Sequence, residues 1–173
     1  SLGALKINEI AADIIEWHWK DGNINHIHAC GRLGKEAFPK MLAERGIKPS
    51  QNSRLDLRDY IDDMDDCLAA ADLVVCRSGA LTLSELEATG KPSILVPSPY
   101  VAENHQYHNA MVLQRRGAAI VIEEKDYDKK KLIEQVEHLY NNPDKLKEYG
   151  KNASSLAILD TAERIYSKIK ESL

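Results

Sequence analysis

The sequence predicts an α/β fold, a doubly wound parallel sheet with helices on both faces. Short apolar runs rich in β-branched residues alternate with longer segments of helical periodicity, which is the pattern of right-handed βαβ units. Two of the runs, Leu73–Cys76 and Ser93–Val96, are apolar along most of their length, as expected for strands that helices cover on both faces. With 173 residues, 43% of them hydrophobic, the chain has the size of one domain.

The individual elements follow from these periodicities and from glycines that end helices. The expected strands are Ile24–Cys30, Arg54–Tyr60, Leu73–Cys76, Ser93–Val96 and Ala118–Ile122. The expected helices are Ile7–Trp19, Lys35–Arg45, Met64–Ala71, Leu81–Thr89 and His105–Arg116. The remainder, Tyr127–Leu173, is expected to be helical with breaks near Asn142-Pro143 and Asn152–Ser155.

The chain starts at Ser1-Leu2-Gly3, which has the composition of a loop that leads into a helix. In many doubly wound sheets the first strand is central. The sequence therefore suggests a piece of a longer protein from which the first strand is absent. A sheet edge left open in this way is expected to be able to pair with another copy.

Charge and composition disfavour several classes of protein. The net charge is −4 and the pI about 5.9, so the chain lacks the excess of positive charge that is typical of nucleic-acid-binding proteins. No apolar run approaches the roughly 20 residues that span a bilayer. The cysteines, three in number and without metal-ligand spacing, favour reduced thiols in a soluble intracellular protein. The charged stretch Glu123–Lys131 mixes both signs and is interpreted as a solvated face.

Ligands of open α/β sheets bind at the carboxyl ends of the strands, and four turns are expected there. They are Ser1–Gly3, Tyr60–Met64, Arg77–Thr82 and Pro97–Gln106.

The third turn is the most informative, because Arg77-Ser78-Gly79 leads from a strand directly into a helix. The first N–H groups of that helix have no partner within it, and the helix dipole adds partial positive charge, so a phosphate or pyrophosphate fits there. Gly79 lets the backbone approach such a ligand, and Arg77 is expected to add charge nearby. The alternative is that Ser78 simply caps the helix.

Glu85 lies one turn into the same helix, where its carboxylate can reach back to the mouth of the turn. A carboxylate that accepts hydrogen bonds from two vicinal hydroxyls commonly holds a ribose in α/β folds. The alternative is an ordinary glutamate that the helix dipole favours.

No metal site is expected. His26 and His28 alternate on one strand without a matching carboxylate or cysteine, and His105 and His108 lie three apart on a helix. Cys76 has no evident base beside it, so we interpret it as a small buried residue and not as a nucleophile.

Several blocks resemble the MurG family of peptidoglycan transferases, which move N-acetylglucosamine from UDP-GlcNAc to lipid I. The blocks are Tyr60–Met64, Ala71–Glu85 (ADLVVCRSGALTLSE), Gly90–Pro92 and Asn104–Gln106. The CRSGALTLSE block is specific, whereas the spacing from Glu85 to Pro92 is shared by many transferases of the two-domain GT-B architecture. The resemblance runs over essentially the whole chain and implies that residues 1–173 form the Rossmann-like, donor-binding C-terminal half.

The resemblance also implies roles for single residues. The backbone of Ile61 would pair with uracil, Glu85 would hold the ribose, and Ser1 would approach the diphosphate from the opposite side. Gln106 would bind hydroxyls of the sugar with help from His105, where some members of the family carry Gln-Gln. The N–H groups that would bind the diphosphate belong to Ala80, Leu81 and Thr82. All the substrate-binding residues expected are Ser1, Ile61, Arg77, Ser78, Gly79, Ala80, Leu81, Thr82, Leu83, Ser84, Glu85, His105 and Gln106.

The implied enzyme is an inverting, metal-independent hexosyltransferase without a cofactor, peripheral to the cytoplasmic side of the membrane. Lipid I, the membrane contact and the catalytic base would belong to an N-terminal half that this chain lacks. The chain alone is therefore expected to be soluble and to bind the donor without transferring the sugar.

Three alternatives remain open at this point. One is the donor-binding subunit of a split dolichol-linked GlcNAc transferase, the second a non-catalytic sugar-nucleotide-binding module, and the third a UDP-GlcNAc 2-epimerase. The CRSGALTLSE block favours the bacterial single-chain enzyme over the split one.

Overall fold

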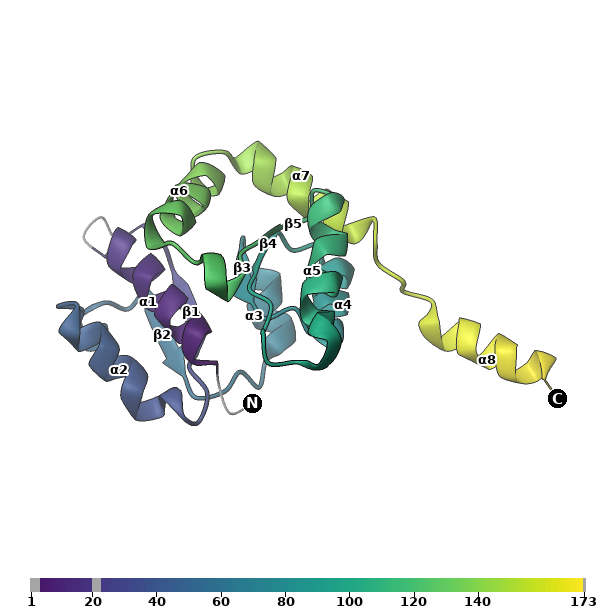
Figure 1. Cartoon of the computed structure of the whole chain (residues 1–173), viewed down its shortest axis with the longest axis horizontal. Helices are drawn as coiled ribbons and strands as arrows, with labels where there is room; N and C mark the ends of the chain where they lie inside the picture. The colour runs from purple at the N-terminus through teal and green to yellow at the C-terminus, as the bar shows by residue number, and fades with distance from the viewer. Residues whose placement is uncertain (1–3, 20–22, 173) are drawn as a thin grey trace.

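The computed structural model describes residues 4–19 and 23–172, in which short strands alternate with helices as predicted (Figure 1). The strands are β1 (His26–Ala29), β2 (Leu55–Arg58), β3 (Val74–Cys76), β4 (Ser93–Leu95) and β5 (Ala119–Val121). The α-helices are α1 (Leu5–His18), α2 (Gly34–Glu44), α3 (Met64–Ala70), α4 (Ala80–Thr89), α5 (His105–Arg115), α6 (Lys129–Tyr140), α7 (Pro143–Ser154) and α8 (Thr161–Glu171). Three short 3-10 turns were not predicted: η1 (Pro49–Gln51), η2 (Ala102–Asn104) and η3 (Glu124–Asp126).

The strands form two parallel ladders. Strand β1 pairs with β2, and a separate ladder has the order β3-β4-β5. This order corresponds to positions 3-2 and 4-5-6 of a doubly wound sheet, and no strand in the described part of the chain takes the central position. The parallel α/β fold is thus confirmed, in the form of two ladders instead of one continuous sheet.

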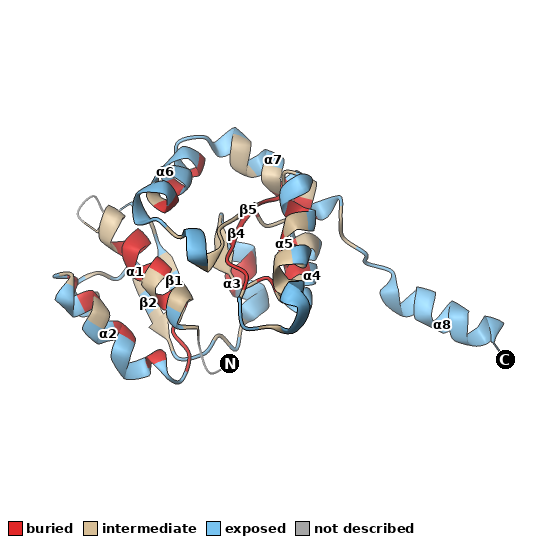
Figure 2. Cartoon of the chain, in the orientation of Figure 1, coloured by how far each residue is buried: buried red, intermediate tan, exposed pale blue. Residues whose placement is uncertain are grey.

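Helix α1 packs against both ladders. Its Ile10 and Ile14 share a core cluster with Ile94 of β4. Its Ile15 belongs to a second cluster, together with Phe38 of α2. Figure 2 shows buried residues along this helix, which lies beside β1. One helix therefore contributes to the cores on both sides.

Polar side chains of α1 strengthen this packing. The amide of Asn8 donates to the carbonyl oxygen of Cys30 at 3.1 Å, and its Oδ1 accepts from Nε2 of His28 at 3.0 Å. Asp13, which is also buried, accepts from the guanidinium of Arg45 at 2.8 Å and from the hydroxyl of Tyr127. Because buried polar groups are costly when they are unpaired, these bonds fix the position of α1.

The β3-β4-β5 ladder has its own core, to which α4, α5 and α7 contribute. Leu86, Leu95 and Leu113 are all buried in it. Helices α4 and α7 approach closely because glycines meet there: a Cβ on Gly150 would lie 2.6 Å from the carbonyl oxygen of Gly90.

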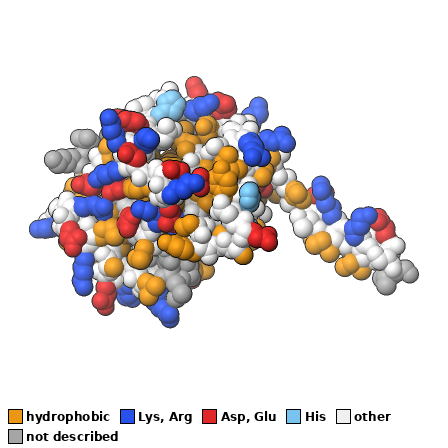
Figure 3. All heavy atoms as spheres, in the orientation of Figure 1, with side chains coloured by type: hydrophobic (Ala, Val, Ile, Leu, Met, Phe, Trp, Pro, Cys, Tyr) orange, Lys and Arg blue, Asp and Glu red, His pale blue; other side chains and the backbone are white. Residues whose placement is uncertain are grey.

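The C-terminal segment departs from the sequence prediction at its second break. Helix α7 continues through Ser154, and the break covers residues 155–160. The helix persists because Ala153 is buried in the core and the amide of Asn152 donates to the carbonyl oxygen of Gly117 at 3.0 Å. After the break, α8 lies apart from the rest of the chain (Figure 1), and all its residues are exposed (Figure 2). Apolar side chains line one side of this helix (Figure 3). They include Ile165 and Ile169.

Among the described helices, none is both long and apolar enough to cross a membrane.

Three histidines lie between α1 and β1. The rings of His18 and His26 stack with their centroids 4.9 Å apart, and His28 packs against Phe38. Burial, together with the charges of His18 and His28, lowers the pKa of His26 to about 3, and burial lowers the pKa of His28 to about 4. The expectation that His26 and His28 serve the fold agrees with this packing.

We expect the domain to lose stability as the pH falls below 6.5. An unfolded histidine has a pKa near 6.5 and takes up a proton that folded His26 and His28 exclude until about pH 3 to 4. Each proton that the folded state excludes lowers the free energy of unfolding by up to about 1.4 kcal/mol for each pH unit below 6.5. Urea unfolding between pH 7.5 and 5 measures this slope. His26→Gln is expected to reduce it, whereas the same change at exposed His138 leaves it as it is; equal slopes in the two variants would contradict the prediction.

Gly90→Ala is expected to destabilise the fold more than Gly46→Ala does. Both glycines have positive φ, +64° and +74°, which costs an alanine about 1–2 kcal/mol. A Cβ on Gly90 would also lie 2.3 Å from Oγ of Ser154, whereas a Cβ on Gly46 meets no atom within 4 Å. This overlap adds about 1–3 kcal/mol, measurable by urea unfolding. Equal losses in the two variants would show that α4 and α7 are not in close contact.

Candidate functional site

The turns that follow β3 and β4 lie at one edge of their ladder, because the two strands are parallel. Helix α4 begins directly after the first turn, and α5 begins after the second. The hydroxyl of Ser78, in the first turn, donates to the carbonyl oxygen of Gln106, in the first turn of α5, at 2.8 Å. The starts of two helices are thereby held side by side at the edge where ligands bind in this class of fold.

The first N–H groups of α4 have no hydrogen-bond partner among residues 4–19 and 23–172. Gly79 occupies the N-cap position with extended backbone, and no side chain caps the helix. The first hydrogen bond inside the helix runs from the N–H of Leu83 to the carbonyl oxygen of Gly79 at 3.0 Å. A Cβ on Gly79 would meet no atom within 4 Å, so the space beside the turn is open. The alternative in which Ser78 caps the helix is wrong, since its hydroxyl is bonded to α5 instead.

Arg77 is held by the protein itself. Its Nη1 donates to the carbonyl oxygens of Val96 at 3.0 Å and Pro97 at 3.2 Å, and its Nη2 lies 2.5 Å from Oε1 of Glu124. The two side chains are only 23% and 16% exposed. Arg77 therefore links the end of β4 to the turn after β5, and its charge is balanced by Glu124. The expected contribution of Arg77 to the binding of an anion stays a prediction.

Sequence reasoning missed Glu124, because it placed the residue on a solvated face. The mixture of charges around it gives no signal for burial, and only the partner Arg77, far away in the sequence, marks it. The interpretation of a fully solvated face is wrong at this position.

Glu85 faces the end of β3. Burial and, to a smaller extent, the negative charge of Glu85 raise the pKa of the Cys76 thiol to about 12, and this effect places the Glu85 carboxylate near the strand end. Within the described residues the Glu85 carboxylate has no ion-pair partner within 4 Å. The thiol of Cys76 stays protonated, in agreement with the expectation that it is not a nucleophile.

The start of α5 has an unusual backbone. Glu103 and Asn104, which are not glycines, both have φ of 51°, in the left-handed region. Such conformations cost about 1–3 kcal/mol each and cluster at functional sites. His105 follows, with Nδ1 2.9 Å from the carbonyl oxygen of Ala102, and the Oε1 of Gln106 accepts from the N–H of Ser98 at 2.9 Å. The loop and the first turn of α5 are thus tied together.

The other predicted site residues divide into groups. Leu83 is buried in the core and its N–H is bonded to Gly79, and the hydroxyl of Ser84 donates to the carbonyl oxygen of Ala80 at 3.2 Å. As ligand contacts, Leu83 and Ser84 stay predictions. Ile61 lies half-buried in the turn after β2, on the other ladder. Ser1 lies outside the described residues.

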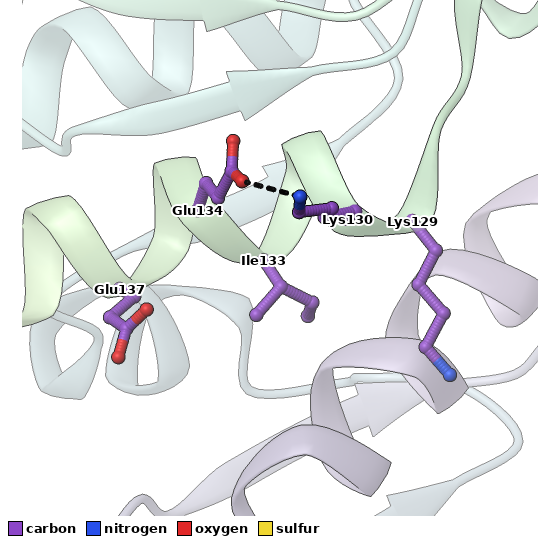
Figure 4. A pocket seen from close by; sticks show the side chains of 5 residues that line it. All are labelled: Lys129, Lys130, Ile133, Glu134 and Glu137. Carbon is purple, nitrogen blue, oxygen red and sulfur yellow. Dashed lines mark ion pairs between the residues drawn. The ribbon is translucent and has the colours of Figure 1, made fainter.

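Two surface pockets lie away from these turns. One of about 560 Å³ runs along α6 and is lined by Lys129, Lys130, Ile133, Glu134 and Glu137 (Figure 4). Lys130 pairs with Glu134 in this pocket, and Lys129 pairs with Glu16 of α1. A second, of about 470 Å³, lies between α5, β5 and α6. Among the described residues no group of three or more histidines, cysteines and carboxylates is placed to hold a metal ion.

Comparison with known proteins decides the family. The model of the glycosyltransferase family 28 C-terminal domain matches residues 1–165. The chain belongs to glycosyltransferase family 28. The matched region contains both helix starts and the turn that carries the candidate site. The resemblance from which the sequence analysis argued is thus confirmed at the level of the family.

Curated relatives in family 28 are about twice as long as this chain. The protein from Caldanaerobacter subterraneus subsp. tengcongensis is 50% identical over 170 residues, and that from Acetivibrio thermocellus is 43% identical over 171. Both are named UDP-N-acetylglucosamine–N-acetylmuramyl-(pentapeptide) pyrophosphoryl-undecaprenol N-acetylglucosamine transferase. The alignments cover 98% and 99% of this chain but only 46% and 45% of the relatives.

Solved structures agree with the fold of this family 28 domain. The crystal structure of Acinetobacter baumannii MurG covers 99% of this chain and 47% of that one, with a TM-score of 0.80 and 27% identity. The glycosyltransferase VinC, solved in complex with dTDP, matches with a TM-score of 0.64 and 20% identity. The Rossmann-like α/β fold of GT-B glycosyltransferases is confirmed by these likenesses.

Arg77 and Glu124 are expected to be coupled in a double-mutant cycle of unfolding free energy. Arg77→Met leaves the Glu124 carboxylate unpaired, which costs about 3–5 kcal/mol when a pair is fully buried and less at this partial exposure. Adding Glu124→Gln is expected to recover part of that loss, with a coupling energy of about 0.5–3 kcal/mol. Urea unfolding of the two single variants and the double variant measures it. Simple additivity would show that the pair does not hold the turn.

Proposed function

We propose that this chain is the donor-binding domain of an inverting transferase that moves GlcNAc from UDP-GlcNAc to lipid I in peptidoglycan synthesis. One observation carries the proposal: the uncapped start of α4, open beside Gly79, lies next to the carboxylate of Glu85. Free N–H groups at a helix start suit a diphosphate, and a nearby carboxylate suits the ribose of the same nucleotide. The names of the family 28 relatives supply the sugar and the acceptor.

The diphosphate is assigned to the N–H groups of Ala80, Leu81 and Thr82, and the ribose to Glu85. The backbone of Ile61 is assigned to uracil on the strength of the family resemblance. Ser1 remains a prediction for the opposite side of the diphosphate. Arg77 enters this proposal only as support for the turn.

The reaction is a direct displacement at C1 of the sugar. The acceptor hydroxyl attacks one face while UDP leaves from the other, so the configuration at C1 inverts. Negative charge develops on the β-phosphate, where the start of α4 stabilises it without a metal ion. The group that deprotonates the acceptor and the surface that meets lipid I and the membrane are assigned to the other half of the enzyme, on the cytoplasmic side. No resident cofactor takes part, and the 173-residue chain binds the donor without transferring sugar.

Glu85→Ala is expected to weaken the binding of UDP by about 1.5–3 kcal/mol, the value of hydrogen bonds to a charged group. Isothermal titration calorimetry of the 173-residue chain with UDP measures the change. Glu87→Ala is the matched control, because Glu87 lies on the same helix two residues further on and carries the same charge. An unchanged dissociation constant for Glu85→Ala, or an equal loss in both variants, would remove Glu85 from the site.

A further inference from the structure

We infer that the outer edge of β5 is a docking site for an extended, basic peptide segment of a partner protein. The inference does not depend on donor binding, because the groove at this edge lies away from the turns that follow β3 and β4. It follows from three features of one surface. They are an edge strand whose outward N–H is covered by a side chain, an apolar groove beside that strand, and a rim on which negative charge is in excess.

Strand β5 is the outer strand of its ladder. It pairs with β4 on one side, and on the other side the N–H of Val121 donates to Oε1 of Gln114 at 2.8 Å. The Gln114 side chain is exposed, so it is free to turn aside and release this N–H. Strand β2, in the other ladder, carries Asp56 and Arg58, and such charges discourage pairing with a further strand. Strand β5, with the sequence AIV, carries no charge.

A groove of about 470 Å³ follows this edge between α5 and α6. Ligand clefts typically have volumes of about 300–1,000 Å³, so the groove has room for part of a partner chain. Its apolar lining comes from Met111 of α5, from Ile120 and Ile122 at the edge, and from Leu132 of α6. A segment that adds to β5 as a further strand directs alternate side chains toward the two helices, where this apolar surface receives them.

The rim of the groove favours a basic segment. Its charged residues are Glu123, Asp126, Asp128 and Lys131, three anions against one cation. Lys125, which is exposed, lies 3.2 Å from Glu123, whereas Asp126 has no ion-pair partner within 4 Å in the described part of the chain. A second copy of this chain has a net charge of −4 and is repelled by such a rim, whereas a basic segment is attracted to it.

The test uses the acetylated and amidated pentapeptide KVIVK as the probe. Its apolar centre has the length of β5, and a lysine at each end brings one lysine to the acidic rim in either direction of pairing. Amide NMR spectra of the 173-residue chain follow the titration. We expect chemical-shift changes centred on residues 119–123, and an affinity about tenfold or more above that of the matched peptide EVIVE.

Two pairs of variants test the contacts. Gln114→Ala removes the group that competes for the Val121 N–H and is expected to tighten the binding of KVIVK by about 2- to 10-fold. Gln135→Ala is its control, because Gln135 also lines the groove but covers no N–H of β5. Asp126→Lys reverses a charge on the rim and is expected to weaken binding by about 3- to 10-fold. The same reversal at exposed Asp144 of α7, outside the groove, leaves the dissociation constant as it is.

Three results of the titration would overturn the inference: shifts centred away from β5, equal affinities for KVIVK and EVIVE, or an unchanged dissociation constant in Asp126→Lys. Analytical ultracentrifugation of Gln114→Ala adds a fourth. A dimer that KVIVK does not dissociate would make a second copy the occupant of this edge and overturn the basic partner. A monomer that binds KVIVK supports the inference.

Discussion

The parallel order of β3, β4 and β5 is the constraint on which the candidate site depends. Parallel strands bring the starts of the helices that follow them to one edge, and here α4 and α5 begin there together. The Ser78 hydroxyl joins the two starts, and the Arg77 guanidinium anchors the end of β4 to the turn after β5. The N–H groups at the start of α4 are therefore held in fixed positions, as the proposed electrostatic stabilisation of a diphosphate requires.

Helix α1 packs against both ladders and so joins the two parts of the domain. The two ladders do not share hydrogen bonds within the described chain, so the packing of α1 on both sides takes the place of a continuous sheet. The buried hydrogen bonds of Asn8 and Asp13 fix that packing in one register. The same construction places the buried histidines beneath α1, where burial keeps them neutral and ties the stability of the fold to pH.

The polar groups near the proposed donor fall into two kinds. Arg77, Ser78 and the amide oxygen of Gln106 are satisfied by the protein and shape the site. In the proposed function, the start of α4 and the carboxylate of Glu85 are the groups that would bind the donor. In this proposal the first kind of group sets the geometry of the site, and the second kind sets the chemistry that it recognises.

Much of the fold could be predicted from the sequence alone. Strand and helix periods, the glycine ends of helices and the CRSGALTLSE block predicted the α/β fold, the turn after Cys76 and the family, because each depends on residues close together in the chain. Tertiary structure alone decided that Arg77 binds Glu124, that Ser78 reaches α5 and does not cap α4, and that α7 continues through Ser154. These outcomes depend on partners that lie between about twenty and fifty residues away, and the free energy of pairing buried polar groups with such distant partners outweighs local preference.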